Sequence, residues 1–362
     1  MKIKKIICFL LAFSPFFAFA VSATSKTHEC VGNLSVIFPG QVEVAANTAE
    51  MLIEEHNVGS IQPKFRFVDG EIAGWTSIAY GGNVFVSHVL NGSQKEKLIT
   101  SQKKLLISAK KFEKKDKEKN SSFKVIDVGT RLGFAAQVGS SFTASLFLQD
   151  HMIWRQSTVS DAAVAKTEAD YLDFVKNVNF RAIGLVPTIP GLCLPYFFIP
   201  AQVSVEKVVG KIASTYRLKD HPDMTVWIED SNSGDDANRD KEKSTQPLYQ
   251  VNDFWSQYEI LPGISKIESE WHFPAGRRVK ISGGEGIASF VKIKRKSGVV
   301  DYGYMAVIQG DNKDQLRSPS IKFYVIRNSE SSLRKNIEPV SKDEFLKISE
   351  EIVSNIKGNL GR

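Results

Sequence analysis

The sequence has few of the residues and motifs on which catalysis most often depends. Its 362 residues include only three cysteines and six histidines. The histidines show neither an H-E-x-x-H motif nor the close spacing of zinc ligands, and no G-x-S-x-G nucleophile elbow is found. The glycine-rich stretch at 282–286 lacks the G-K-[ST] ending of a phosphate loop and lies between strand-like runs, so it reads as a hairpin turn. We therefore predict no catalytic residue, no metal site and no cofactor.

Long apolar runs are confined to the N-terminus. Lys2, Lys4 and Lys5 precede an apolar run over residues 6–20, and small residues suitable for cleavage follow. This pattern predicts a secretory signal peptide over residues 1–23; a retained membrane anchor is the alternative. No later run approaches the length of a membrane span, so we expect an exported protein without stable membrane insertion.

Two cysteines, Cys30 and Cys193, remain after the predicted cleavage. In an oxidising compartment, an isolated pair most simply forms one disulfide, although two free buried thiols remain an alternative. Closing so long a loop would restrict the unfolded chain by about 4–5 kcal/mol in the entropy model. A nucleophilic role for Cys193 would need surroundings that lower its pKa, and a structural role is the simpler interpretation.

The order of strand-like and helix-like segments predicts an α+β protein with two domains of similar plan. Each domain would be an antiparallel sheet with a few packed helices, over residues 24–186 and 187–362. Prolines at 187, 190, 195 and 200 mark the joint, because each fixes φ and removes a backbone donor. Ser341 with Glu344 predicts the start of a C-terminal helix.

A basic helix is predicted over residues 93–119, where Ser93 and Glu96 form a capping box. The segment 95–124 holds eleven lysines and four acidic residues, so it carries a net charge of +7, equal to the formal charge of the whole chain. Leu98, Leu105, Ala109 and Phe112 fall on one helical face. The helix is either a solvated element packed on its own sheet or an interaction surface. In the second case we expect Lys103, Lys110 and Lys114 to contact a partner. Because we expect the protein to be exported, we do not expect nucleic acid as its partner.

Five stretches carry a family resemblance. They are, in order, "CVGNLSVIFPG", "FRAIGLVPTIPGLCL", "FPAGRRVKISGGEG", "SPSIKFYVIRN" and "VSKDEFLKISEEIVSNIK". Their order resembles that of the type VI secretion immunity proteins that protect bacteria against class-four phospholipase effectors. The pair of landmarks around Cys30 and Cys193 is the most specific part of this resemblance, which covers most of residues 30–357.

The resemblance implies a periplasmic, non-enzymatic protein that grips a cognate phospholipase effector and blocks access to its active site. Two other functions stay open from the residues alone. One is an exported hydrolase whose catalytic residues the sequence does not reveal. The other is a module of the cell envelope that binds anionic lipid through the basic helix at 93–119.

Overall fold

A computed structural model describes most of the chain after the predicted signal peptide. The described residues are 26–58, 64–74, 76–117, 123–158, 164–201, 210–231, 246–271, 276–310 and 320–358. The predicted signal peptide at 1–23 lies outside them.

The first half of the chain is mainly short strands with three helices. Its elements are β1 (Thr27–Val31), β2 (Leu34–Phe38), β3 (Val42–Val44), α1 (Ala49–Val58), β4 (Ser77–Tyr80), β5 (Asn83–Val86), α2 (Gly92–Lys117), β6 (Phe123–Val125), β7 (Gly133–Val138), β8 (Ser141–Leu148), β9 (His151–Thr158), α3 (Val164–Asn177) and β10 (Asn179–Phe180).

The second half has longer strands. Its elements are β11 (Gly191–Leu194), β12 (Phe197–Pro200), β13 (Gly210–Leu218), β14 (Met224–Ser231), α5 (Pro247–Glu259), β15 (Ile264–Ser269), β16 (Arg277–Ile281), β17 (Gly284–Arg295), β18 (Val300–Ile308), β19 (Ser320–Arg327), α6 (Ser329–Arg334) and α7 (Lys342–Ser354).

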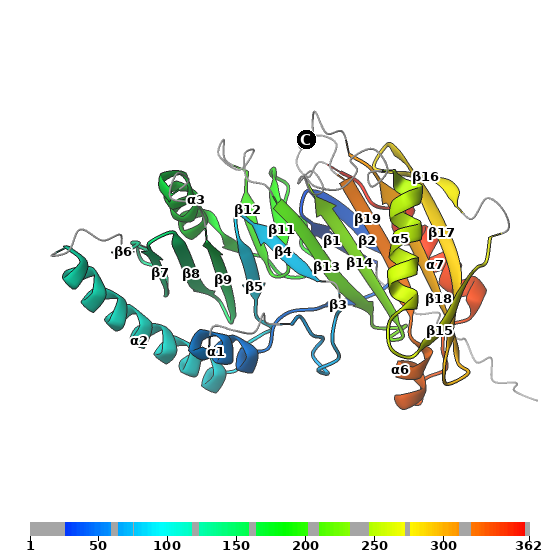
Figure 1. Ribbon diagram of the computed structural model, residues 1–362, viewed down its shortest axis with the longest axis horizontal. Coiled ribbons are helices and arrows are strands. Elements are labelled where there is room, and N and C mark those ends of the chain that lie inside the picture. Colours follow the sequence, from blue (N-terminus) through cyan, green and yellow to red (C-terminus); the bar gives the residue numbers. More distant parts are fainter. Residues whose placement is uncertain are drawn as a thin grey trace, which may run out of the picture.

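Strands from both halves join in one large sheet (Figure 1). Its order is β15-β17-β18-β19-β14-β13-β4-β5-β9-β8-β7-β6, with β16 added beside β17 and β3 beside β13. The strands pair antiparallel throughout, which confirms the predicted α+β class. The halves meet where β13 pairs with β4. The division into domains at residue 187 stays a prediction.

The central strand β13 is buried along almost its whole length, and β1 contacts it. On one face, α5 packs Val251 and Trp255 against the strands of the second half. Helix α7 contributes Phe345 and Ile352 to the main core. The β1–β2 hairpin also packs on this half, where Ser35 and Lys357 exchange two backbone hydrogen bonds of 2.8 and 2.9 Å. These two hydrogen bonds connect the N-terminal hairpin to the C-terminal end of the described chain.

The structure confirms two local predictions, the start of α7 and the turn at 282–286. Helix α7 begins as predicted, with Ser341 Oγ accepting a hydrogen bond from the Glu344 amide. The 282–286 stretch forms the predicted hairpin, since β16 and β17 are joined at Ile281 and Gly284 through a two-residue turn with positive φ. Helix α1 lies between β3 and β4.

The basic helix differs in two details from its prediction. Its capping box is formed by Asn91 and Gln94, which exchange two side-chain-to-backbone hydrogen bonds, and Ser93 already lies inside the helix. Phe112 was expected on the buried face, but 60% of it is exposed. Leu98 and Ala109 are buried as expected.

Candidate functional site

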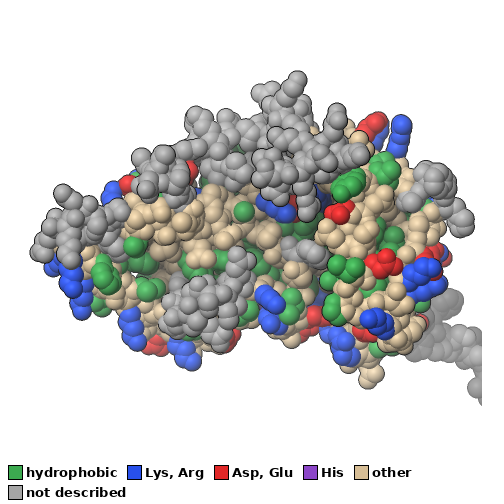
Figure 2. Space-filling model, viewed as in Figure 1, with side chains coloured by type: hydrophobic (Ala, Val, Ile, Leu, Met, Phe, Trp, Pro, Cys, Tyr) green, Lys and Arg blue, Asp and Glu red, His purple; other side chains and the backbone are tan. Residues whose placement is uncertain are grey.

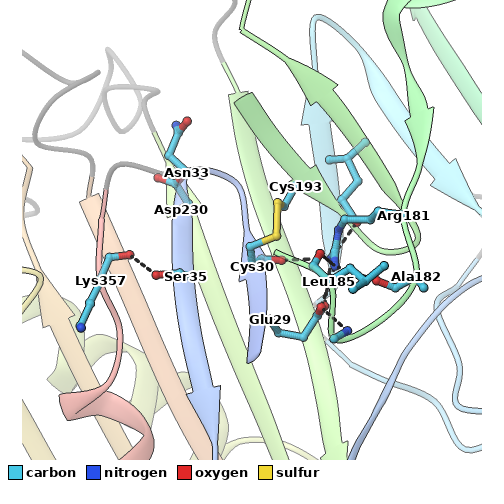
Figure 3. Close-up of a disulfide and its surroundings, with 12 residues drawn as sticks. Glu29, Cys30, Asn33, Ser35, Arg181, Ala182, Leu185, Cys193, Asp230 and Lys357 are labelled. Atoms are coloured by element: carbon cyan, nitrogen blue, oxygen red, sulfur yellow. Dashed lines mark hydrogen bonds and ion pairs between the residues drawn. A yellow bond between two sulfur atoms is a disulfide. The ribbon is translucent and has the colours of Figure 1, made fainter. Parts of the chain in front are cut away.

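A disulfide lies where the N-terminal hairpin meets the proline-rich joint (Figure 3). Cys30 of β1 and Cys193 of β11 are bonded, with their Cα atoms 5.6 Å apart, and both are buried. Beside them, Gly32 and Cys193 exchange two backbone hydrogen bonds. Gly32 has φ +58, and a Cβ there would lie 2.2 Å from an oxygen of Asp230, so only glycine fits. The bond thus ties the joint to the first hairpin.

A buried ion pair adjoins the disulfide. The Arg181 guanidinium donates to both carboxylate oxygens of Glu29, at 2.6 and 2.9 Å, and both side chains are almost fully buried. The Tyr216 hydroxyl also donates to Glu29, and its burial raises its pKa well above the usual range. Burial alone would lower the pKa of Arg181, but Glu29 outweighs this effect and raises it. Arg181 is therefore held in its charged form.

Arg181 also fixes the backbone around it. It donates to the carbonyl oxygens of Cys30, Leu194, Ala182 and Leu185. Two charges taken out of water seldom add net stability, but such a pair favours one arrangement of the groups around it. The disulfide and the ion pair together hold β1, β11 and the loop after β10 in one arrangement. We call this group the seam clamp, defined as Glu29, Cys30, Arg181 and Cys193.

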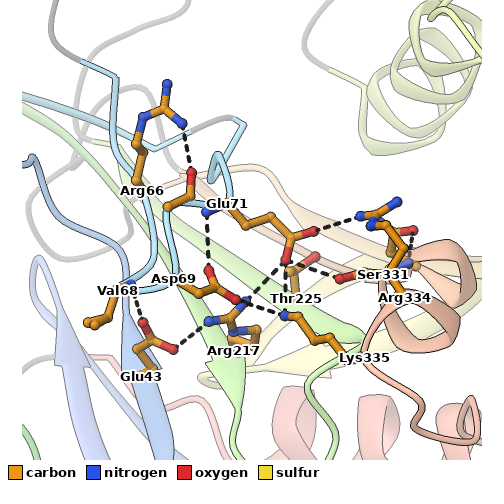
Figure 4. A network of polar contacts seen from close by, with 12 residues as sticks. Glu43, Arg66, Val68, Asp69, Glu71, Arg217, Thr225, Ser331, Arg334 and Lys335 are labelled. Carbon is orange, nitrogen blue, oxygen red and sulfur yellow. Dashed lines mark hydrogen bonds and ion pairs between the residues drawn. The ribbon is translucent and has the colours of Figure 1, made fainter.

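A second polar network bridges the halves near α6 (Figure 4). Arg217 of β13 donates to Glu43, Asp69 and Glu71, and Lys335 donates to the last two of these. Burial alone would raise the pKa of Asp69, but the hydrogen bonds from Lys335 and Arg217 outweigh it and hold the pKa well below its usual range. The network fixes the 66–73 turn of the first half against α6 of the second.

The predicted partner-binding lysines lie elsewhere. Lys103, Lys110 and Lys114 are on α2, and in Figure 2 basic side chains gather along the outer end of the molecule over this helix. All three are exposed, and within the described chain no carboxylate pairs with them. The structure brings the two cysteines together but keeps the lysines away from the seam clamp. Their partner-binding role stays a prediction.

Within the described ranges, no group of three or more His, Cys, Asp or Glu side chains could hold a metal ion. Every helix in those ranges is too short or too polar to cross a membrane.

Sequence reasoning missed Glu29, Arg181 and Arg217, whose roles depend on contacts between distant segments. Glu29 directly precedes Cys30, and a charge inside the alternating pattern of a buried strand was the one available signal. Arg181 gave no such signal, because it lies in a loop-like stretch before the prolines.

The C-terminal half of the chain matches a known protein family. Residues 185–358 match the family model described as the Tle cognate immunity protein 4 C-terminal domain. No curated protein matches this chain.

Solved immunity proteins share the fold of this chain. The apo structure of the type VI secretion immunity protein TplEi of Pseudomonas aeruginosa is similar, with a TM-score of 0.56 and 14% identity over 94% of this chain and 99% of that one. TplEi in complex with an "L" peptide gives 0.55 and 15% over 93% and 99%. A chain of the Tle4–Tli4 complex gives 0.55 and 14% over 94% and 100%. Residues 185–358 therefore belong to the Tle cognate immunity protein 4 C-terminal domain family, and the chain as a whole has the fold of type VI secretion immunity proteins.

Proposed function

We propose that this protein is a periplasmic immunity protein, which binds a type VI secreted phospholipase effector and protects the cell that produces it. The observation that carries the proposal is the match of residues 185–358 to the Tle cognate immunity protein 4 domain. The fold shared with a chain of the Tle4–Tli4 complex supports it over 94% of this chain.

The mechanism is occlusion, and it assigns no catalytic step to this chain. A stable interface would bury more than about 1,000 Å² and deny substrate a path to the enzyme. Binding loses less free energy when the interface is already ordered. The continuous sheet, the seam clamp and the Arg217 network supply that order by joining segments far apart in the sequence. The predicted domains, residues 24–186 and 187–362, would then act as one body.

Two features support a location in the periplasm. One is the basic and apolar segment at 1–23. The other is the disulfide, which forms and persists in oxidising compartments. The basic helix α2 would add electrostatic attraction through Lys103, Lys110 and Lys114, which raises the association rate with an acidic partner more than the affinity.

The proposal is tested in cells that direct the cognate phospholipase effector into their own periplasm. Co-production of the full chain should restore growth. A variant without residues 1–23 should not restore it, although it is present in the cytoplasm, because the effector acts in another compartment. Growth arrest in the presence of the exported full chain would contradict the proposal.

A further inference from the structure

The loop after β10 holds one apolar side chain in the solvent on a backbone that is firmly fixed. Leu185 is 63% exposed. Its amide donates to the Ala182 carbonyl at 3.2 Å, and its own carbonyl accepts from Arg181 at 3.3 Å. One residue earlier, the Gly184 amide donates to Glu29 at 3.0 Å. Arg181 and Glu29 of the seam clamp thus hold the backbone that bears the exposed side chain (Figure 3).

Burial of the Glu29–Arg181 pair costs desolvation free energy, and the exposed Leu185 side chain adds no stability unless a partner covers it. Glu29 and Arg181 are desolvated to hold this loop, and a buried pair of that kind is weak evidence for a stabilising role. Pro187 and Pro190 restrict the chain further, and Ile189 between them is 53% exposed. An apolar side chain whose position is fixed before binding loses little entropy when a partner covers it, which is the property of an interface anchor.

A groove with a defined charge lies next to Leu185. Its volume is about 450 Å³, and its lining includes Gly184, Ile183, Gln41 and three basic residues, Lys26, His28 and Lys219. Among the described residues that line it, none carries a carboxylate. Lys26 pairs with Glu351 at 3.2 Å across the exposed surface, whereas Lys219 donates to the neutral Gln41 side chain at 3.4 Å. The groove therefore complements a negatively charged group.

We infer that Leu185 and this groove form the central anchor of the interface with the effector. Leu185 would enter an apolar hollow of the enzyme surface, and a carboxylate beside that hollow would enter the groove toward Lys219. The inference rests on the proposed function and adds to it the surface of this chain that the enzyme covers.

The test measures binding of the purified cognate phospholipase effector to three variants of the oxidised full chain. L185D and K219E each change one part of the anchor. I260D is the matched control, because Ile260 is an exposed apolar residue (82%) at the end of α5. We expect L185D to weaken binding at least about thirtyfold, as for a buried anchor, and K219E about tenfold. The control should bind like the wild type.

Melting temperature and the intact disulfide are recorded for each variant, so a loss of binding is not confused with unfolding. A folded L185D that binds like the wild type would overturn the inference, as would equal losses in L185D and I260D. In both cases wild-type binding would leave the proposed function standing. Failure of the wild type itself to bind would instead reject the proposed function.

Discussion

Glu29 and Arg181, 152 residues apart in sequence, share two buried hydrogen bonds directly beside the Cys30–Cys193 disulfide. A covalent and an ionic link thus converge on the same few residues. Together they connect the first strand of the described chain to its proline-rich middle, which is the region most specific to the family resemblance. This convergence makes the seam clamp the natural place to test how rigidity supports binding.

Removal of the disulfide should weaken the whole structure. The bond closes a sequence separation of 163 residues, and loss of such a constraint costs about 4–5 kcal/mol in the entropy model. We expect C193S to melt at a lower temperature than the oxidised wild type and to bind the effector more weakly. A reducing agent should shift the wild type to the same behaviour and leave C193S unchanged. Identical melting of the reduced and oxidised wild type would refute the structural role of the bond.

The ion pair should behave differently from the disulfide in a double-mutant cycle. R181M leaves Glu29 buried and uncompensated, so we expect a loss of about 3–5 kcal/mol in the free energy of unfolding. The double variant E29Q/R181M removes both charges and should recover part of that loss. Denaturant titration of the wild type, R181M, E29Q and the double variant measures the coupling. Additive effects of the two changes would show that the charges do not act as a pair.

The lysines of α2 should increase the rate of association with the effector. Lys103, Lys110 and Lys114 lie about two turns and one turn apart on the helix. Their joint reversal to glutamate should slow association at low salt, and the difference should shrink as salt rises.

The matched control for these lysines is K280E/K296E/K347E, which changes three exposed lysines in the second half by the same charge. Stopped-flow association rates compare the two triple variants. Equal rates for both at low salt would assign α2 to the structural role of a solvated helix. Loss of binding to vesicles of anionic lipid, with unchanged effector rates, would favour the envelope module instead.

Asp230 should make stability depend on pH. Burial raises the pKa of this carboxyl to about 6, from an ordinary value of 3.8. A raised carboxyl pKa favours the protonated form in the folded state, so this group stabilises the fold most below about pH 4. That contribution is lost as pH rises through about 6.

We expect D230N to remove this dependence, because an amide oxygen can still accept the hydrogen bond from the Asn33 amide. Unfolding free energies measured between pH 4 and 7 compare the variant with the wild type. Parallel curves for the two proteins would show that Asp230 titrates like an exposed carboxyl.

Some of the structure was accessible from sequence because it depends on local pattern. Ser341 and Glu344 predict the start of α7, since a cap involves only residues three positions apart. The cap of α2 was placed at Ser93 in place of Asn91, because two overlapping capping patterns occur within one turn. Phe112 shares the apolar face of Leu98, but a helical face says nothing about where the underlying strands end.

The rest depends on pairing between distant segments, which a single sequence does not contain. The contact of β13 with both β3 and β4 joins the two halves of the sheet. It also places Arg217 between Glu43 and Asp69. No spacing along the chain indicates that these charges meet. The two cysteines were simpler, because only two follow the predicted signal peptide.

The most direct test is a titration of phospholipase activity with the purified, oxidised protein. The cognate phospholipase effector is assayed on phospholipid vesicles while the protein is added in increasing amounts. Occlusion predicts that hydrolysis falls in proportion to the protein added and ends when the binding sites are filled, while the protein alone hydrolyses nothing. Full activity at a large molar excess, or lipid hydrolysis by the protein itself, would contradict an immunity role.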